Sequence, residues 1–291
     1  MSNFQSVCVF NKSFGLPHYD TPQLTILLEN TKLSKLRVDL CVEEAGELDE
    51  AFATHNFTEI IDALTDELYV AYGAGSSFGV NLDYLFRYRV VNKLYLFTQP
   101  EREPIDILTY EKHMDDNIKH MTNYKLLRYM LQKTDTFFTE NRVSNINSDD
   151  IFGETFITAE YENIRLTMDE LHNNLNMSIK QLEVNKNIQS FHGVVGVLVD
   201  ILYHTYKLGI FLGIDLDRSF DIVHRSNMSK LCVSEEEATE TVDHYKLNDK
   251  RYKNPDYRKS DNDNYWVVFN RDTGKILKSI NYTPADFREL F

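Results

Sequence analysis

Five carboxylates fall within the eight positions from Glu43 to Glu50, in the stretch EEAGELDE. Residues four apart lie on one face of a helix, so Glu43 and Glu47 are neighbours, and Glu44 lies about 60° from Glu47 around the helix axis. Three carboxylates can therefore converge. Asp49 and Glu50 fit the solvent-exposed face that an acidic run usually forms, in a chain with 45 acidic residues.

A second pair of acids, Asp62 and Asp66, begins fifteen residues after Glu47. Their neighbours in IIDALTDELYVAY are mostly apolar or aromatic, which indicates that these carboxylates face inward. Buried carboxylates repel each other and lose hydration, so they need protons, cations or a metal ion. Several hard oxygen donors suit Mg²⁺, with Mn²⁺ as the alternative. The predicted metal ligands are Glu43, Glu44, Glu47, Asp62 and Asp66.

Composition sets the class of protein that must position these acids. The 291 residues allow one large or two ordinary domains, and 42% hydrophobic with 26% charged residues is typical of a globular protein. A net charge of −14 argues against general binding of nucleic acids. We expect no membrane segment and no leader, and the three dispersed cysteines fit a cytoplasmic, reducing location.

The spacing of apolar residues predicts a mostly helical, all-α chain. We expect helices at about 22–52, 57–78, 82–97, 104–138, 161–185, 190–212 and 216–231. The first two would pack as an antiparallel pair and bring the two groups of acids together. The polar residues 234–264 should be loop-like, and residues 265–282 should form a small β-hairpin around an Asp-Thr-Gly turn.

An internal repeat links two parts of the chain. Residues 62–86 align without a gap on residues 196–220, with ten identities in 25 positions. The shared residues include Tyr72 with Tyr206 and Asp83 with Asp217. Two related helical units in one chain predict a fused pseudo-dimer, packed like the subunits of a homodimer. Further pairing of two chains stays open.

The second unit lacks the acids of the first. Met177, Ser178 and Gln181 stand where the first unit has Glu43, Glu44 and Glu47, and Gly196 replaces Asp62. Of the five predicted metal ligands, only Asp66 has an acidic counterpart, Asp200. Such a one-sided loss is not expected of acids that merely solvate a helix. The first unit is therefore the predicted metal-binding half.

Two stretches of the first unit resemble a known protein family. The stretches EEAGE (43–47) and IIDALTDELYVAYGAGSSFGVNLD (60–83) resemble the all-alpha nucleoside triphosphate pyrophosphatase superfamily, which includes MazG, dimeric dUTPases and phosphoribosyl-ATP pyrophosphohydrolase. Its metal motif pairs Glu on one helix with acids on the next, and Glu59 is an alternative for one ligand. The stretch GIDLDRSFDIVHRSNMSKL (213–231) resembles a substrate-facing element of the family, and residues 272–287 resemble the ending of MazG-like pyrophosphatases of bacteria and viruses.

The resemblance implies two MazG-like helical bundles and a tail. The expected boundaries are 1–98 for the unit with the metal site, 99–150 for a helical connector, 151–231 for the degenerate unit, and 232–291 for the tail with its hairpin. In the first unit Asn92 and Lys93 adjoin, so the Asn-Met-Ser-Lys spacing of 227–230 is absent there. We therefore expect one site per chain, with metals held by the first unit and substrate by the second.

The implied activity is Mg²⁺-dependent cleavage of a nucleoside triphosphate to monophosphate and pyrophosphate, with dUTP or a related deoxynucleotide as the preferred substrate. Phosphoribosyl-ATP, nonstandard nucleotides and alarmones stay open. Glu44 and Glu47 are the candidate catalytic residues, with Glu44 preferred as general base. The candidate substrate-binding residues are Asn227, Lys230, Arg225, Tyr69 and Asn81. The alternative is a non-catalytic nucleotide-binding or assembly protein with the same fold. The family also fits a viral or phage origin.

Overall fold

The computed structural model describes residues 1–135, 159–248, 252–261 and 264–291. Within them it confirms an all-α fold with one small antiparallel sheet. The elements are α1 Asn3–Ser13, α2 Ile26–Glu29, α3 Thr31–Ala53, α4 Phe57–Phe78, α5 Leu82–Thr98, η1 Tyr110–His113, α6 Asp116–Lys119, α7 Asn123–Thr134, α10 Ala159–Asn187, α11 Phe191–Phe211, α12 Leu216–Met228, α13 Glu235–Asn248, β1 Pro255–Lys259, β2 Trp266–Asn270 and η3 Phe287–Leu290.

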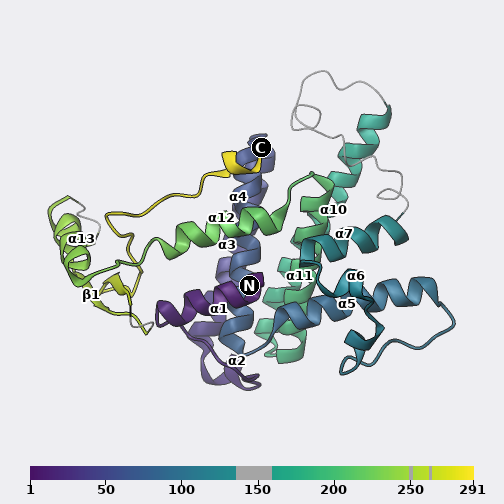
Figure 1. The fold of residues 1–291 in the computed structure, drawn as a ribbon, viewed down its shortest axis with the longest axis horizontal. Coiled ribbons are helices and arrows are strands. Elements are labelled where there is room, and N and C mark those ends of the chain that lie inside the picture. The colour runs from purple at the N-terminus through teal and green to yellow at the C-terminus, as the bar shows by residue number, and fades with distance from the viewer. Residues whose placement is uncertain (136–158, 249–251, 262–263) are drawn as a thin grey trace.

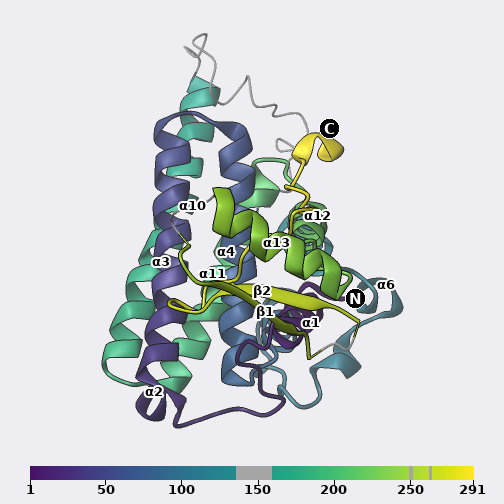
Figure 2. The same ribbon diagram turned by 90° about the vertical axis from the view of Figure 1, so that its left-hand side faces the viewer.

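Two long helical pairs form the body of the molecule. The helix α3 packs along α4, α10 packs along α11, and the middle helices α4 and α11 contact each other. The third helix of each unit crosses to the opposite pair, because α12 packs on α4 and α5 packs on α11. Figure 1 shows α12 running across the upright α3–α4 pair, and Figure 2 shows α3 and α4 side by side. This exchange places the end of α12 beside the acids of the first unit.

Backbone features recur at the offset of 134 residues that the sequence repeat has. His55 and Gln189, which precede α4 and α11, have φ angles of 54° and 56°. Gly79 and Gly213, which follow these helices, have φ angles of 72° and 73°. A left-handed residue after a helix is the usual way to end it, and glycine adopts that conformation without strain. Equivalent turns therefore bound α4 and α11.

A buried polar network joins the two units at the centre. The hydroxyl oxygens of Tyr72 and Tyr206 lie 3.3 Å apart. The amide of Asn123 donates to Tyr72 at 3.0 Å and to Asp83 at 2.6 Å. The amide of Asn3 donates to Tyr206 at 2.9 Å and to an oxygen of Asp217 at 2.8 Å.

These two asparagines hold equivalent places, since Asn3 begins α1 and Asn123 begins α7. Each bonds to the Tyr and Asp of one unit, so the helices α1 and α7 are related in the same way as the two units. Buried polar groups of this kind specify a unique arrangement when each has a partner.

Three expectations about helices were wrong. The single helix predicted at 22–52 is divided into α2 and α3 at Asn30, whose side chain accepts the backbone N–H of Leu33. The helix α1 was not predicted, although Ser2 and Gln5 form a capping box, which is a sequence signal for a helix start. The single helix predicted at 104–138 is replaced by η1, α6 and α7, because Asp115 and Thr122 accept from the N–H groups that begin α6 and α7. Residues 136–158 of the predicted connector and second unit lie outside the described residues.

The tail also differs from expectation. The polar stretch predicted as loop contains α13, whose first turn carries three glutamates that favour a helix N-terminus. It also contains β1, which is the strand that pairs with β2. The second run predicted as a strand makes one isolated bridge, between Phe269 and Ile276. Beyond it, the backbone N–H groups of Lys278 and Ile280 donate to Tyr245 and Thr241 of α13.

The helix α11 is long and apolar enough to span a membrane, and no other described helix is. Its most apolar window is 72% buried inside the protein. Contacts with α4, α5, α7 and α10 cover it on several sides, which is how the central helix of a bundle is packed. Its composition is explained by its place in the core.

Two glycines of α11 give a matched stability test. A Cβ on Gly209 would lie 2.4 Å from an atom of Leu216, whereas a Cβ on Gly196 would meet nothing within 4 Å. We expect Gly209→Ala to lower the free energy of unfolding by about 1–3 kcal/mol, and Gly196→Ala to raise it by about 0.5–1 kcal/mol through helix propensity. Chemical denaturation measures both, and equal effects would contradict this packing.

Candidate functional site

The acids of α4 lie on the one face of that helix that packing leaves open. From Ile60 to Phe78 nearly every residue of α4 is buried. The exceptions in that range are Asp62, Asp66 and Val70, which follow each other at four-residue spacing and are half-buried. They form a stripe along the helix. The predicted inward-facing acids therefore border the core without being enclosed in it.

The helix α3 presents its acids to this stripe. Glu44 is half-buried, while Glu43 and Glu47 are exposed. The pKa of Glu44 is raised to about 8, first by burial and then by the nearby charges of Asp66, Glu47, Glu43 and Asp62. The other four predicted ligands therefore lie within electrostatic range of Glu44, as the antiparallel pairing of α3 and α4 requires.

The pKa values of the two α4 carboxyls are also raised by burial and by neighbouring acids. Burial, followed by repulsion from Asp62, raises the pKa of Asp66 to about 7, and Lys230 opposes this rise. Burial raises the pKa of Asp62, and Glu59 is the next largest cause. Glu59 is thus within reach of the cluster, as the alternative ligand must be.

The donor set fits a hard divalent cation, which would neutralise this mutual repulsion. Among the described residues, however, no group of three or more His, Cys, Asp or Glu side chains is already arranged to hold a metal ion. The metal site therefore stays a prediction, supported by carboxylates of α3 and α4 that lie within electrostatic range of Glu44.

The sequence did not single out Glu67, which is buried behind the cluster. Its side chain is 1% exposed, and neither carboxylate oxygen has a hydrogen-bond partner within good geometry. Burial, followed by the charge of Glu44, raises its pKa well above the usual value. Burial also raises the pKa of the adjacent Cys41 thiol. The only sequence signal was its place between Asp66 and Leu68, since its charge does not suit a core position.

The second unit contributes a lysine to the site. Lys230 follows α12 and donates to the Oδ1 atom of Asn227 at 2.6 Å. Burial lowers the pKa of Lys230, and the charge of Asp66 opposes this shift. A cation of one unit and an acid of the other thus lie within electrostatic range, as the predicted division of labour requires.

Two predicted substrate residues take structural positions. Tyr69 is 8% exposed, stacks on Phe220 with ring centroids 5.2 Å apart, and shares a hydrogen bond of 3.1 Å with His224. It therefore belongs to the contact between α4 and α12. Arg225 is exposed, and its guanidinium forms an ion pair of 2.5 Å with Glu289 of the tail.

Asn81 lies at the far end of α4 from the acids. Its Oδ1 atom accepts the backbone N–H of Tyr84 and caps α5. Sixteen residues of α4 separate Asp62 from Phe78, which is roughly 24 Å at about 1.5 Å per residue. The prediction that Asn81 contacts the base beside this acid cluster was therefore wrong, because the helix holds the two apart.

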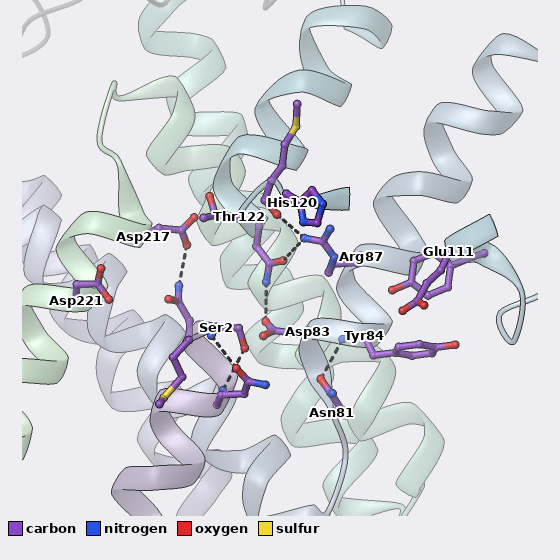
Figure 3. A pocket seen from close by; sticks show the side chains of 16 residues that line it. Ser2, Asn81, Asp83, Tyr84, Arg87, Glu111, His120, Thr122, Asp217 and Asp221 are labelled. Atoms are coloured by element: carbon purple, nitrogen blue, oxygen red, sulfur yellow. Dashed lines mark hydrogen bonds between the residues drawn. The ribbon is translucent and has the colours of Figure 1, made fainter. Parts of the chain in front are cut away.

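Asn81 instead borders a cavity of about 450 Å³ between the starts of α1, α5 and α7. Figure 3 shows Asp83, Arg87 and Asp217 around it. The guanidinium of Arg87 donates hydrogen bonds to the backbone oxygens of Met121, Ile118 and Lys119. The cavity contains no member of the α3–α4 acid cluster, so it is separate from the candidate site.

The corresponding place in the second unit is closed by ion pairs. Asp200, which matches Asp66, pairs with Arg89 of α5. Lys93 lies 4.1 Å from the ring centroid of Tyr203. Asn92 accepts the backbone N–H of Ile105 at 2.9 Å. The residues that would form a second site are therefore used in packing.

Comparison with known proteins agrees with this geometry. The family model of phosphoribosyl-ATP pyrophosphohydrolase matches residues 7–88, which contain every predicted metal ligand. Residues 7–88 of this chain belong to the all-alpha nucleoside triphosphate pyrophosphatase superfamily. The superfamily match covers the acidic unit and ends before α12 begins.

A relative that matches this chain over nearly its whole length comes from a giant virus. The uncharacterised protein L479 of Acanthamoeba polyphaga mimivirus is 34% identical over 291 residues, covering 99% of this chain and 95% of the relative. No solved structure matches the chain. The relative spans both units and the tail, and its source is consistent with a viral origin for this chain.

The closed second unit predicts a pH-dependent stability. Burial, then the charge of Arg89, lowers the pKa of His204 from 6.5 to about 4; Lys93 and Lys207 act in the same direction, and Asp200 opposes them. The unfolded chain binds this proton near pH 6.5 and the folded chain does not, so stability falls as the pH drops from 6.5 towards 4.

We expect His204→Gln to remove part of this acid sensitivity. Lowering the pH from 7 to 5 should destabilise the wild type relative to the variant, as measured by the difference between their urea midpoints. The raised pKa values of Glu44 and Asp66 act in the opposite direction, but they are present in both proteins and cancel in this difference. The same pH dependence in both proteins would contradict a neutral His204 in the folded chain.

Proposed function

We propose that the chain is a Mg²⁺-dependent nucleoside triphosphate pyrophosphohydrolase with one site, built from both units. Family membership supports a nucleotide pyrophosphohydrolase in general. The observation that carries the finer proposal is the pairing of the acid cluster on α3 and α4 with Lys230 from the end of α12. The carboxylates of α3 and α4 suit a metal ion, and the ammonium group of Lys230 suits a phosphate.

The metal would be held by Glu43, Glu44, Glu47 and the two aspartates of α4. When bound, Mg²⁺ neutralises phosphate charge and lowers the pKa of water. Lys230, oriented by Asn227, would bind the phosphate chain through charge-assisted hydrogen bonds. A carboxylate of the cluster, with Glu44 preferred, accepts the proton of the attacking water. An O–P bond forms at the α-phosphorus and the bond to the pyrophosphate oxygen breaks.

The same proposal explains why the chain carries two units of unequal composition. The units form a fused pseudo-dimer in which α12 crosses to the acids of the first unit. Asp200 lacks the glutamate counterparts that Asp66 has and is satisfied by Arg89. A single chain can therefore supply both halves of one site without a second copy. The preferred substrate class is a deoxynucleoside triphosphate such as dUTP, used inside the infected cell.

The test is release of pyrophosphate from a panel of nucleotides with Mg²⁺, including dUTP and phosphoribosyl-ATP. We expect Glu47→Gln to lower the rate by about 100-fold or more, because a lost ligand or base removes metal-assisted catalysis. Glu50→Gln, an exposed glutamate on the same helix, is the matched control and should keep wild-type activity.

Two results would count against the proposal. A Glu47→Gln variant with full activity would refute the assigned metal site. Binding of nucleotides without release of pyrophosphate from any of them would favour the alternative, a non-catalytic nucleotide-binding protein with this fold.

A further inference from the structure

The C-terminal tail is fastened along α12, next to the basic half of the site. The hydroxyl of Ser226 donates to that of Tyr282 at 3.0 Å. The backbone N–H of Thr283 donates to the hydroxyl of Ser229 at 2.9 Å. Farther along the tail, the ring centroid of Phe291 lies 6.4 Å from that of Phe57, the first residue of α4. Figure 1 shows this segment in yellow, running back beside α12 towards α4.

This path brings two exposed lysines of the tail to the end of α12. The ammonium group of Lys278 lies 4.3 Å from the ring centroid of Tyr282, which is bonded to Ser226. Its backbone N–H donates to Tyr245 of α13 at 3.1 Å. Lys275 lies 5.9 Å from the ring centroid of Tyr252. Both lysines are therefore held by aromatic contacts while their charges stay accessible to solvent.

Lys275 and Lys278 act on Lys230, the lysine of the proposed site. Both add repulsion to the burial that lowers the pKa of Lys230, and Asp66 opposes them. Lys230 thus has both tail lysines within electrostatic range, and Lys278 is placed near the end of α12 by its contact with Tyr282, in a chain whose net charge is −14. Such a group of like charges is unfavourable by itself and favours a multiply charged anion.

The orientation of a bound nucleoside triphosphate follows from the positions of the carboxylates on α3 and α4 and of the lysines beside them. Cleavage at the α-phosphorus requires that phosphorus to lie with the carboxylates and their metal. The β- and γ-phosphates, which carry most of the negative charge, then extend towards a region of opposite sign. In the described part of the tail and α12, that region is made by Lys230, Lys275 and Lys278.

We propose that Lys275 and Lys278 of the tail, together with Lys230, bind the β- and γ-phosphates and so select triphosphates by their pyrophosphate leaving group. This inference rests on the proposed function, which it deepens. The tail becomes part of the substrate site, so that each chain needs three segments to complete it: the α3–α4 pair, the end of α12 and residues 275–283.

The test is binding of inorganic pyrophosphate in the presence of Mg²⁺, measured by calorimetry on the full chain. Each of Lys275→Gln and Lys278→Gln should weaken binding by about tenfold, as loss of a charge-assisted contact does. Lys278→Arg should retain most of the affinity. Lys246→Gln is the matched control, since Lys246 is an exposed lysine of α13 that pairs with Asp243 at 3.7 Å.

A second arm separates the pyrophosphate end from the rest of the nucleotide. Binding of the nucleoside monophosphate product should change less than twofold in the two glutamine variants, while KM for the triphosphate rises. The variant that carries both Lys275→Gln and Lys278→Gln completes the test. If it keeps the wild-type melting temperature and also the wild-type affinity for pyrophosphate, the inference is overturned.

The outcome for this inference is distinct from that for the proposed function. A wild type that binds pyrophosphate through these lysines but hydrolyses no nucleotide would refute the activity alone. If the wild type is active but the Lys275→Gln and Lys278→Gln substitutions leave the affinity for pyrophosphate unchanged, only the proposed role of the tail is refuted.

Discussion

The crossing of α12 over α4 is the contact on which the rest of the site depends. Thr65 donates to Ser219 at 2.8 Å, and Tyr69 stacks on Phe220, so the two helices are joined by a buried hydrogen bond and by aromatic packing. This contact sets the end of α12 against the open stripe of acids on α4. Without it the carboxylates would have no cationic neighbour from the second unit, and burial would only favour their protonation.

The two helical units resemble each other in packing and differ in charge. In each unit the middle helix is almost wholly buried and its turn geometry is the same, because both serve the same packing role. The units then diverge where packing does not constrain them. The first keeps a stripe of carboxylates, whereas the second places Arg89 against its remaining Asp200. One half can thus carry repulsive charge while the other half supplies stability.

Much of the helical body could be predicted because its signals are local. The bounds of α4, α5, α11 and α12 follow from apolar spacing, Asn and Asp caps, and the glycines after α4 and α11. Prediction failed where a local signal was overlooked, as for α1, or where tertiary contacts decided. The run after Gly274 makes only one bridge to β2, where Leu277 donates to Val268, and the following N–H groups of Lys278 and Ile280 donate to Tyr245 and Thr241 of α13.

The sequence by itself determined the all-α class, the five acids and their one-sided loss from the second unit, because these depend on residue type and spacing. Only the tertiary structure decided which acids share a surface and which cations approach them. It removed Asn81 from the site, since a rigid helix separates it from Asp62, and it turned Arg225 towards Glu289. It brought Lys230 and the tail lysines to the acids, because contacts between distant segments are set by packing, which spacing along the chain does not encode.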